Sequence, residues 1–297
     1  MSGDGHRARA VLQMAVLLAA FCIRAENEGT GRFRYTAYKR LCDCPPPWRS
    51  PKGALVCQMN CKSQDQQDVA VYTQFFAGQR HKGVYVEMGA NNGERTSNTY
   101  AYDRVLGWNG VLIEANPAEC KNIAKTRPRD TAVCSAVSAD SKPIEFETGL
   151  DPLGFAATDK INARWRTKWH HGKVNNKTWT KFKVSSVKVS VPSKPLGQIL
   201  REAKITAIDY FSLDVEGSEL AVLETMDWTI PVRVWMIENR PQFAGISQHI
   251  TKLFEKHGYE PVSWLDRADL RLPNDQLYVK KGSDESRASC PGHRLCE

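Results

Sequence analysis

Short apolar segments alternate with helical segments between residues 83 and 280 of this 297-residue chain. Short strands that are apolar on both faces are typical of a parallel sheet that helices cover on both sides. The sequence therefore predicts an α/β fold whose functional loops follow the carboxyl ends of the strands. We predict strands at 83–88, 110–114, 131–137, 208–213, 232–237, 259–264 and 276–280, and helices at 69–76, 97–106, 118–126, 195–203, 219–226 and 246–257.

The composition is that of a globular protein, with 41% apolar and 25% charged residues. It excludes collagen-like, low-complexity and wholly disordered chains. No uncharged apolar stretch reaches the roughly 18 residues that a membrane-spanning helix needs. We therefore expect no stable membrane span, unless the N-terminal segment is an uncleaved anchor.

The first 25 residues are typical of a signal peptide or signal anchor. A short basic start precedes an apolar run over residues 10–23, and small residues suited to cleavage lie at its end. A buried N-terminal helix is the alternative. The domain organisation that we predict is a Cys/Pro-rich extension at 26–65, a main domain at 66–284 with a basic insertion at about 151–194, and a tail at 285–297.

The cysteines agree with entry into the secretory pathway. Besides Cys22 the chain has an even number of them, which in an oxidising compartment indicates disulfide bonds. A zinc site at the first four is the alternative, with spacings that are loose for zinc. Together with a glycosylation sequon at Asn176, the cysteines predict a protein of the ER or Golgi lumen, or a secreted one. Local clustering favours pairs within Cys42, Cys44, Cys57 and Cys61, between Cys120 and Cys134, and between Cys290 and Cys296.

A ligand-binding loop is predicted after the first strand, over residues 87–93 (EMGANNG). Gly89 permits a positive φ or a close approach, and Gly93 lets the next helix pack near a ligand. Backbone N–H groups in such a loop can hold a carboxylate. Glu87 would repel a pyrophosphate and attract an ammonium. The loop therefore suits S-adenosylmethionine, whose amino-acid end carries a carboxylate and an ammonium, better than a dinucleotide.

A second acidic residue, Glu114, ends the second predicted strand and is followed by Ala115 and Asn116. An acidic side chain at this place can accept hydrogen bonds from both hydroxyls of a ribose. A surface glutamate at a helix N-terminus is the alternative. Together with Glu87 and the glycines one strand earlier, Glu114 favours a nucleoside-binding site.

Four motifs occur in order within residues 69–281, namely VYVEMGANNGERTSNT, GVLIEANP, DYFSLDVEGSELAVLETMDW, and VRVWMIENR with the closing GYEPVSW and NDQLYVKKG. Together they resemble the FkbM family of S-adenosylmethionine-dependent methyltransferases. The resemblance implies a Rossmann-like class I methyltransferase fold, with a seven-stranded, mostly parallel sheet, helices on both faces and an antiparallel last strand. It also implies O-methylation, often of sugar hydroxyls. Neither the Cys/Pro-rich extension nor the basic insertion is covered by it.

The resemblance also implies which residues hold the cofactor, S-adenosyl-L-methionine. Its methionine part would lie on the first loop, its ribose at Glu114, and its adenine near the residues that follow the third strand. The implied cofactor-binding residues are Glu87, Gly89, Ala90, Asn91, Gly93, Glu114, Ala115, Asn116, Ser135 and Ala136.

Three acidic residues at strand ends are candidate catalytic bases. Asp214 and Glu216 follow the fourth predicted strand, and Glu238 follows the fifth. Methyl transfer to a hydroxyl needs a group that removes the hydroxyl proton, and a carboxylate in a cleft can do this. Two alternatives stay open, because Asp214 and Glu216 could only cap the next helix, or the three carboxylates could hold a divalent cation. We predict no metal.

Residues 160–188 hold nine Lys and Arg and no Asp or Glu. The formal net charge of the chain is +8, so everything outside this segment sums to −1. Trp165 and Trp169 lie among the basic residues; tryptophan stacks on sugar rings, while Arg and Lys attract sulfate or uronate groups. The segment therefore indicates a glycan acceptor, in particular an anionic one, with a solvated insertion as the alternative. Single-stranded nucleic acid also binds basic aromatic segments, but the lumenal signals argue against a nucleic-acid partner.

The sequence thus predicts an S-adenosylmethionine-dependent O-methyltransferase that acts on a sugar hydroxyl of a glycan in the secretory pathway. The alternative is a non-catalytic lumenal binding or trafficking protein that retains the methyltransferase fold. A nucleotide-dependent oxidoreductase is disfavoured by Glu87 and by the closing pair of strands.

Overall fold

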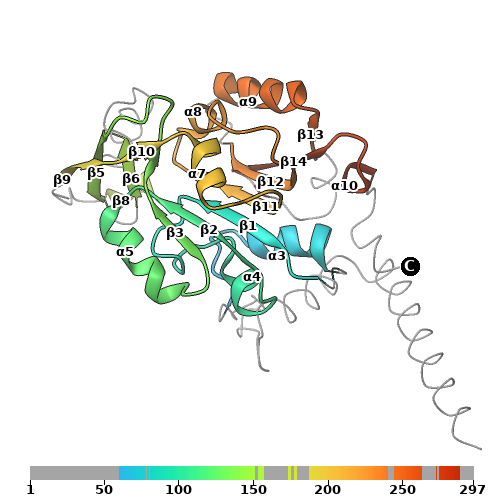
Figure 1. The fold of residues 1–297 in the computed structure, drawn as a ribbon, viewed down its shortest axis with the longest axis horizontal. Helices are drawn as coiled ribbons and strands as arrows, with labels where there is room; N and C mark the ends of the chain where they lie inside the picture. Colours follow the sequence, from blue (N-terminus) through green and yellow to red (C-terminus); the bar gives the residue numbers. More distant parts are fainter. Residues whose placement is uncertain are drawn as a thin grey trace, which may run out of the picture.

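A seven-stranded sheet of order β13-β14-β12-β11-β1-β2-β3 lies at the centre of the fold (Figure 1). The structure is a computed structural model that describes residues 60–77, 79, 81–150, 153–156, 173–174, 177–178, 187–239, 244–262, 272 and 274–287. The strands of the sheet are β1 (Val84–Met88), β2 (Asn109–Glu114), β3 (Thr131–Cys134), β11 (Ile208–Leu213), β12 (Val232–Glu238), β13 (Tyr259–Pro261) and β14 (Asp275–Lys280).

Strand direction in this sheet agrees with the sequence-based expectation. Neighbouring strands from β3 to β12 are parallel. The last strand of the sheet, β14, is antiparallel to both β12 and β13. The prediction of a seven-stranded, mostly parallel sheet with an antiparallel last strand is therefore confirmed. The carboxyl ends of β3, β2, β1, β11 and β12 consequently meet along one edge.

Helices cover both faces of the sheet (Figure 1). One face packs against α3, η1, α4 and α5, and the other against α7, α8 and α9. The bounds of the helices, with α10 beside β14, are α3 (Gln67–Val71), η1 (Tyr72–Phe76), α4 (Tyr100–Arg104), α5 (Pro117–Thr126), α7 (Leu196–Glu202), α8 (Glu219–Leu223), α9 (Ala244–Lys256) and α10 (Asp284–Arg287).

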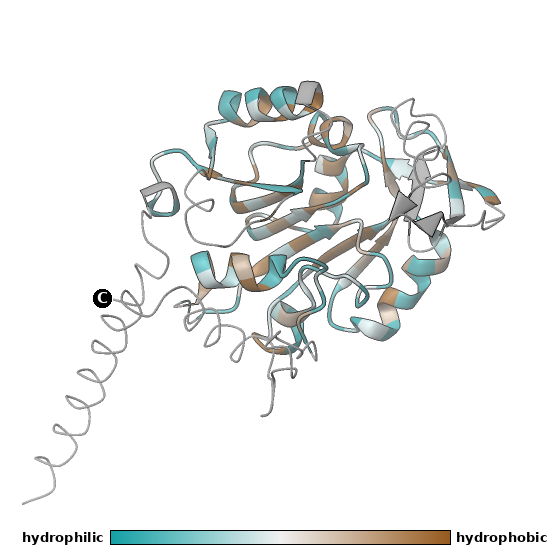
Figure 2. Ribbon diagram, turned by 180° about the vertical axis from the view of Figure 1, so that it is seen from behind, coloured by the Kyte–Doolittle hydropathy of each residue, from teal (hydrophilic) through white to brown (hydrophobic). Residues whose placement is uncertain are grey.

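Successive residues of the central strands β1, β2, β11 and β12 enter opposite cores, because side chains alternate across a strand. Tyr85 of β1 packs in the core under α3 and α4, whereas its neighbour Val86 packs in the core under α7 and α8. Both side chains are completely buried. Figure 2 shows the same pattern, with brown, apolar strands between helices that are teal on their outer sides. Burial on both faces explains why the central strands are mostly apolar.

Within the described residues, three small sheets accompany the central one; apart from β4, which lies inside the predicted strand 131–137, their strands were not predicted from the sequence. The largest has the order β6-β5-β9, and the others pair β10 with β4 and β7 with β8. They lie within or next to the predicted basic insertion. Their strands are β4 (Ala136–Val137), β5 (Ile144–Leu150), β6 (Leu153–Ala156), β7 (Lys173–Val174), β8 (Lys177–Thr178), β9 (Val187–Val191) and β10 (Ser193–Lys194).

The prediction of one continuous third strand over 131–137 is wrong. The strand leaves the central sheet at Ser135, whose backbone N–H donates to the Glu114 carbonyl at 3.1 Å. The next residue, Ala136, donates instead to the Pro192 carbonyl at 2.9 Å, and so begins the pairing of β4 with β10. The partner is far away in the sequence, so the local pattern carries no signal for the break.

The predicted helix at 97–106 is shorter in the structure, where α4 begins only at Tyr100. Ser97, Asn98 and Thr99 are instead hydrogen-bonded to the buried side chain of Glu87. The predicted disulfide between Cys120 and Cys134 is confirmed, and Cys61 is also disulfide-bonded. Within the part of the chain that the structure describes, no helix is both long and apolar enough to cross a bilayer.

Several predictions lie outside the described residues. They are the signal segment at 1–25, nearly all of the Cys/Pro-rich extension, the Cys290–Cys296 pair, the sequon at Asn176, and the tryptophans Trp165 and Trp169.

Candidate active site

A cleft of about 150 Å³ lies at the carboxyl edge of the central sheet. Its walls come from the ends of β1, β2, β3 and β11, together with β4 and β5 of the small sheets. A site at this edge is what the α/β topology predicts. Nine of the predicted site residues line the cleft, namely Gly89, Asn91, Glu114, Ala115, Asn116, Ser135, Ala136, Asp214 and Glu216.

Gly89 joins the ends of β1 and β11. Its φ is +82°, and a Cβ atom built on it would lie 1.8 Å from the carbonyl oxygen of Asp214. On the other side, the Gly89 backbone N–H donates to the Ile113 carbonyl at 3.0 Å. Gly89 thus lies between Asp214 and Ile113, which lie in or directly after the strands on either side of β1. No other residue type fits there, because every other side chain begins with a Cβ. The prediction that this glycine permits a close approach and a positive φ is confirmed.

Three non-glycine residues that line the cleft have left-handed backbone conformations. The φ angles are +51° at Asn91, +58° at Thr96 and +55° at Glu216. Thr96 is β-branched, and a positive φ is rare for such a residue. Conformations of this kind each cost about 1–3 kcal/mol and gather at functional sites, where the surrounding structure enforces them. Three such residues around one cleft support it as the candidate functional site.

Glu114 links the first two loops of the cleft. Its carboxylate accepts hydrogen bonds from the backbone N–H groups of Asn91 and Asn116, both at 2.7 Å. A carboxylate has about four lone-pair sites, so capacity to accept from a ligand remains. Burial raises the pKa of Glu114 to about 7. Glu114 is therefore more than a surface glutamate at a helix N-terminus, since it is buried and shapes the cleft.

Glu87 lies in β1, the strand next to that of Glu114, and has a different role. Its side chain is buried, and its carboxylate accepts from the backbone N–H of Asn98 and the hydroxyls of Ser97 and Thr99. It lines a smaller recess beside the main cleft. Burial raises the pKa of Glu87, while the positive charge of Arg127 acts in the opposite direction. The carboxylate thus holds the loop that follows the glycines.

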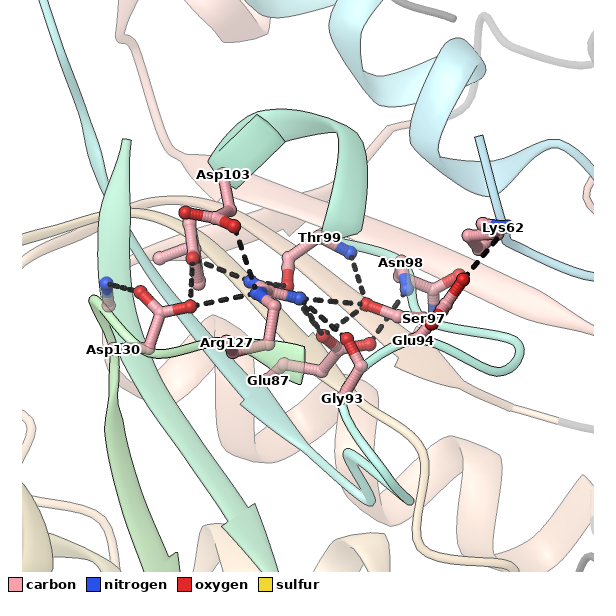
Figure 3. Close-up of polar contacts among 12 residues, drawn as sticks. Lys62, Glu87, Gly93, Glu94, Ser97, Asn98, Thr99, Asp103, Arg127 and Asp130 are labelled. Carbon is pink, nitrogen blue, oxygen red and sulfur yellow. Dashed lines mark hydrogen bonds and ion pairs between the residues drawn. The ribbon is translucent and has the colours of Figure 1, made fainter. Parts of the chain in front are cut away.

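Arg127 is the centre of this buried network and was missed by the sequence analysis (Figure 3). Its side chain is completely buried. The guanidinium donates to the Gly93 carbonyl at 3.0 Å and the Thr99 hydroxyl at 3.1 Å, and lies 4.0 Å from the Glu87 carboxylate. It also pairs with Asp130 at 2.8 Å. A single arginine after a helix carries no sequence signal of burial, because its partners come from separate segments.

Two predicted cofactor residues lie behind the cleft rather than in its walls. Ala90 is buried, and its backbone N–H donates to the Ile113 carbonyl at 3.2 Å. Gly93 has a φ of +80°, and a Cβ there would lie 2.9 Å from the Arg127 side chain. The structure therefore places these two residues in the support of the loop.

The three predicted catalytic carboxylates come together. Oxygen atoms of Asp214, Glu216 and Glu238 all lie within 4.8 Å of one another. Asp214 and Glu216 line the cleft, and Glu238 ends the neighbouring strand β12. Carboxylate oxygens are suitable ligands for Mg²⁺ or Ca²⁺, so the three residues could hold such a cation. The same arrangement can also remove a proton from a hydroxyl.

Glu219 fixes the loop that carries Asp214 and Glu216. Its buried Oε1 accepts the backbone N–H groups of Val215 and Gly217 at 3.0 and 3.1 Å. Burial raises the pKa of Glu219 to about 7, and the negative charge of Asp214 adds to the effect. The sequence analysis assigned Glu219 no role in the site.

The opposite end of the cleft is apolar, and part of its wall was also missed. Ser135 and Ala136 lie there as predicted, together with Ile144 and Phe146 of β5. Phe146 is buried to 7% exposure. The strand β5 follows the third predicted strand without any motif, so no sequence signal pointed to Phe146.

The Cys120–Cys134 disulfide ties α5 to the end of β3. Cys134 pairs in register with Glu114 across the two strands and directly precedes Ser135. The bridge therefore braces two neighbouring segments of the cleft wall.

The family model of the FkbM methyltransferase domain matches residues 87–261 of the chain. The chain belongs to the FkbM methyltransferase family. The match begins at Glu87 and includes Glu114, Asp214 and Glu238, so the cleft lies within the family domain. The protein is a methyltransferase, and members of such families in general use S-adenosylmethionine as methyl donor.

Other comparisons of this FkbM methyltransferase give more distant likenesses. Among solved structures it is similar to the precorrin-6y C5,15-methyltransferase of Geobacter metallireducens GS-15, with 11% identity over 67% of this chain and 73% of that chain, and a TM-score of 0.35. It is also similar to the fibrillarin pre-rRNA processing protein of Methanococcus jannaschii, with 9% identity over 68% of each chain and a TM-score of 0.34. A search of curated proteins finds no match.

Proposed function

We propose that this FkbM methyltransferase binds S-adenosyl-L-methionine in the cleft and methylates a sugar hydroxyl of a glycan in the secretory pathway. The observation that carries the proposal is the continuity of the cleft across the ends of β3, β2, β1 and β11. The cleft runs from an apolar end at Phe146, past the hydrogen-bond-accepting carboxylate of Glu114, to the turn at Gly89. Beside this turn lies the acidic residue Asp214.

The residues fit the cofactor in chemistry as well as in order. Phe146 and Ala136 offer an apolar wall for the adenine, and Glu114 offers carboxylate oxygens for the ribose hydroxyls. The tight turn at Gly89, where a Cβ would collide with the carbonyl oxygen of Asp214, brings the ends of β1 and β11 together at the place proposed for the amino-acid end. Asn91, whose backbone is in the left-handed conformation, belongs to the same loop.

Catalysis by the chain itself would consist of positioning and proton removal. S-adenosylmethionine, when bound, supplies a sulfonium methyl group that an oxygen nucleophile can take by in-line displacement. One of Asp214, Glu216 and Glu238 accepts the proton of the acceptor hydroxyl, with Asp214 or Glu216 preferred because both line the cleft. Proton transfer to such a base contributes typically 10²–10⁴-fold to a rate. Holding the hydroxyl in line contributes the rest.

The acceptor and the compartment rest on further features. The Cys120–Cys134 disulfide suits an oxidising compartment, and the apolar run near the N-terminus suits entry into it. The basic segment 160–188 suits an anionic glycan. These features support a lumenal or secreted enzyme that acts on a glycan.

A direct test uses purified, disulfide-bonded protein with S-adenosylmethionine and a panel of neutral, sulfated and uronate-containing oligosaccharides. We expect methyl transfer to at least one glycan, and we expect Asp214→Asn to lower turnover more than cofactor binding. Cofactor binding with no transfer to any glycan would overturn the acceptor assignment. A protein that binds glycans but no cofactor would be the non-catalytic lumenal binding protein.

A further inference from the structure

A recess of about 30 Å³ adjoins the cofactor cleft between the ends of β1 and β11. It shares part of its wall with the cleft, including Gly89, Thr96 and Asp214. Glu87 of β1 and Ser212 of β11, which pair in register, line its inner part. The recess is therefore a polar extension of the cleft at the end away from Phe146.

Asn98 is the side chain in this recess that the fold alone does not explain. It is buried to 6% exposure and lines the recess. Its backbone N–H donates to Glu87 at 2.7 Å, and its Nδ2 donates to the Ser212 hydroxyl at 3.0 Å. Its Oδ1 is buried and has no hydrogen-bond partner among the described residues. Leaving such an acceptor unsatisfied is costly, so a group that donates to it would be stabilised.

The size and charge of the recess indicate which hydrogen-bond donor group fits beside Asn98 Oδ1. A volume of about 30 Å³ matches the space of one water-sized group. The wall offers the acceptors Glu87 and Asn98 Oδ1 and would repel a carboxylate. An ammonium is compact, carries positive charge and has three hydrogen-bond donors. The recess therefore suits an ammonium group better than an anion or an apolar group.

We propose that Asn98 is a specificity-determining residue that recognises the α-ammonium of the cofactor's amino-acid arm, together with the Glu87 carboxylate. The inference rests on the proposed function, because it takes S-adenosylmethionine to lie in the adjoining cleft. The ammonium donates to Asn98 Oδ1, whose amide is held in place by its hydrogen bond to Ser212.

The outer wall of the recess comes from the segment before the family domain. Gln64 and Gln67 line it, and the Gln67 side chain is fixed by Asp275 at 3.2 Å and by Asp65 at 2.8 Å. Buried Asp68 anchors the same segment. Since the family match begins at Glu87, this wall is supplied by a part of the chain outside the matched domain.

The test compares two ligands that differ only in the amino group. One is S-adenosylhomocysteine, and the other is its deaminated analogue, 5′-S-(3-carboxypropyl)-5′-thioadenosine. Calorimetry gives the ratio of their dissociation constants for the wild type, for Asn98→Ala and for the control Asn109→Ala, whose side chain is exposed at the start of β2. Binding alone is measured, so catalytic activity does not enter the result.

We expect the wild type and Asn109→Ala to favour the amino compound strongly, and Asn98→Ala to lose about tenfold or more of that preference. The affinity of Asn98→Ala for the deaminated analogue should stay within about twofold of wild type. An equal loss for both ligands, or an unchanged preference, would overturn the assignment. If Asn98→Ala does not fold, Ser212→Ala must lower the same preference by about threefold, and an unchanged preference in that variant also overturns it.

The failure of the underlying proposal gives a different result. A wild-type protein that binds both ligands equally well contradicts the assignment of the ammonium to Asn98 and Glu87, but not the cofactor site in the cleft. A wild-type protein that binds neither ligand contradicts the cofactor site itself, and the recess assignment with it.

Discussion

The guanidinium of Arg127 lies 4.0 Å from the carboxylate of Glu87, and both side chains are buried beneath the first loop of the cleft (Figure 3). The two are also joined indirectly, since the Thr99 hydroxyl donates to Glu87 and accepts from Arg127. Arg127 in addition holds the Gly93 carbonyl. The backbone of the cofactor loop is therefore supported from below by a charge pair that never meets solvent.

Removing Arg127 should destabilise the protein strongly. Arg127→Met leaves Glu87, Asp103 and Asp130 without their common cation, and breaking buried pairs of this kind costs about 3–5 kcal/mol. Urea unfolding measures the change in free energy. The control is Arg201→Met, which removes an exposed arginine from a surface ion pair with Asp227 and should cost less than about 1 kcal/mol. A similar loss of unfolding free energy in the two variants would contradict the claim that the buried network around Arg127 stabilises the fold.

Gly89→Ala should abolish the geometry of the first turn. A Cβ at this residue lies 1.8 Å from the Asp214 carbonyl, so β1 and β11 would have to separate. We expect a loss of stability of more than about 3 kcal/mol and a loss of cofactor binding, measured by thermal unfolding and calorimetry. The control is Gly107→Ala, which also has a positive φ of +65° but whose nearest atom lies 3.4 Å away on the flexible Lys82. It should cost only about 1 kcal/mol, and an equal cost in both would show that backbone conformation alone decides the effect.

The central strands β1, β2, β11 and β12 could be predicted from the sequence because most of their residues are buried and apolar. Gly89 and Glu114 could be found because they follow such strands, where the fold places its ligand loops. Arg127 and Phe146 could not be identified from the sequence. The burial of Arg127 depends on Asp103, Asp130 and Glu87, which come from three separate segments.

Irregular pairing escaped prediction for the same reason. The third strand breaks at Ser135 because its continuation pairs with β10, more than fifty residues later. The strand β5, which brings Phe146 to the cleft, pairs with β6 and with the distant β9. Neither event leaves a local pattern in the sequence.

The stability of the protein should fall as the pH rises from about 4.5 to about 7, in part because of Glu219. Its pKa is raised by burial from 4.5 to about 7, so in this interval the folded state retains a proton that the unfolded state has lost. Glu219→Gln keeps an oxygen that can accept from Val215 and Gly217 and removes the titration. The variant should therefore gain on the order of 3 kcal/mol relative to wild type between about pH 4.5 and pH 8.

Urea unfolding at several pH values measures this slope. Glu114 contributes in the same direction and is present in both proteins, so the difference reports Glu219 alone. Glu224→Gln, which changes an exposed glutamate after α8, is the matched control and should leave the slope unchanged. A slope that is equal in wild type and Glu219→Gln would show that Glu219 does not titrate in this interval.

The Cys120–Cys134 disulfide should stabilise the fold and the cleft together. It closes a loop with a sequence separation of 14, for which the loss of unfolded-state entropy corresponds to about 3 kcal/mol. The double variant Cys120→Ser/Cys134→Ser should lose about this much in urea unfolding. Because Cys134 adjoins Ser135 and pairs with Glu114, S-adenosylhomocysteine should also bind less tightly. A loss of stability with unchanged affinity for S-adenosylhomocysteine would show that the disulfide stabilises the fold but does not shape the cleft.

The cofactor site is tested directly by a calorimetric titration of the purified wild-type protein and of Glu114→Ala with S-adenosylmethionine and S-adenosylhomocysteine. We expect one-to-one binding of both ligands to the wild type, and an affinity lower by about tenfold or more for Glu114→Ala, because the carboxylate proposed to accept hydrogen bonds from the ribose hydroxyls is gone. Wild-type affinity in Glu114→Ala would contradict the placement of the ribose. No binding by well-folded, disulfide-bonded wild-type protein would contradict the cofactor site as a whole.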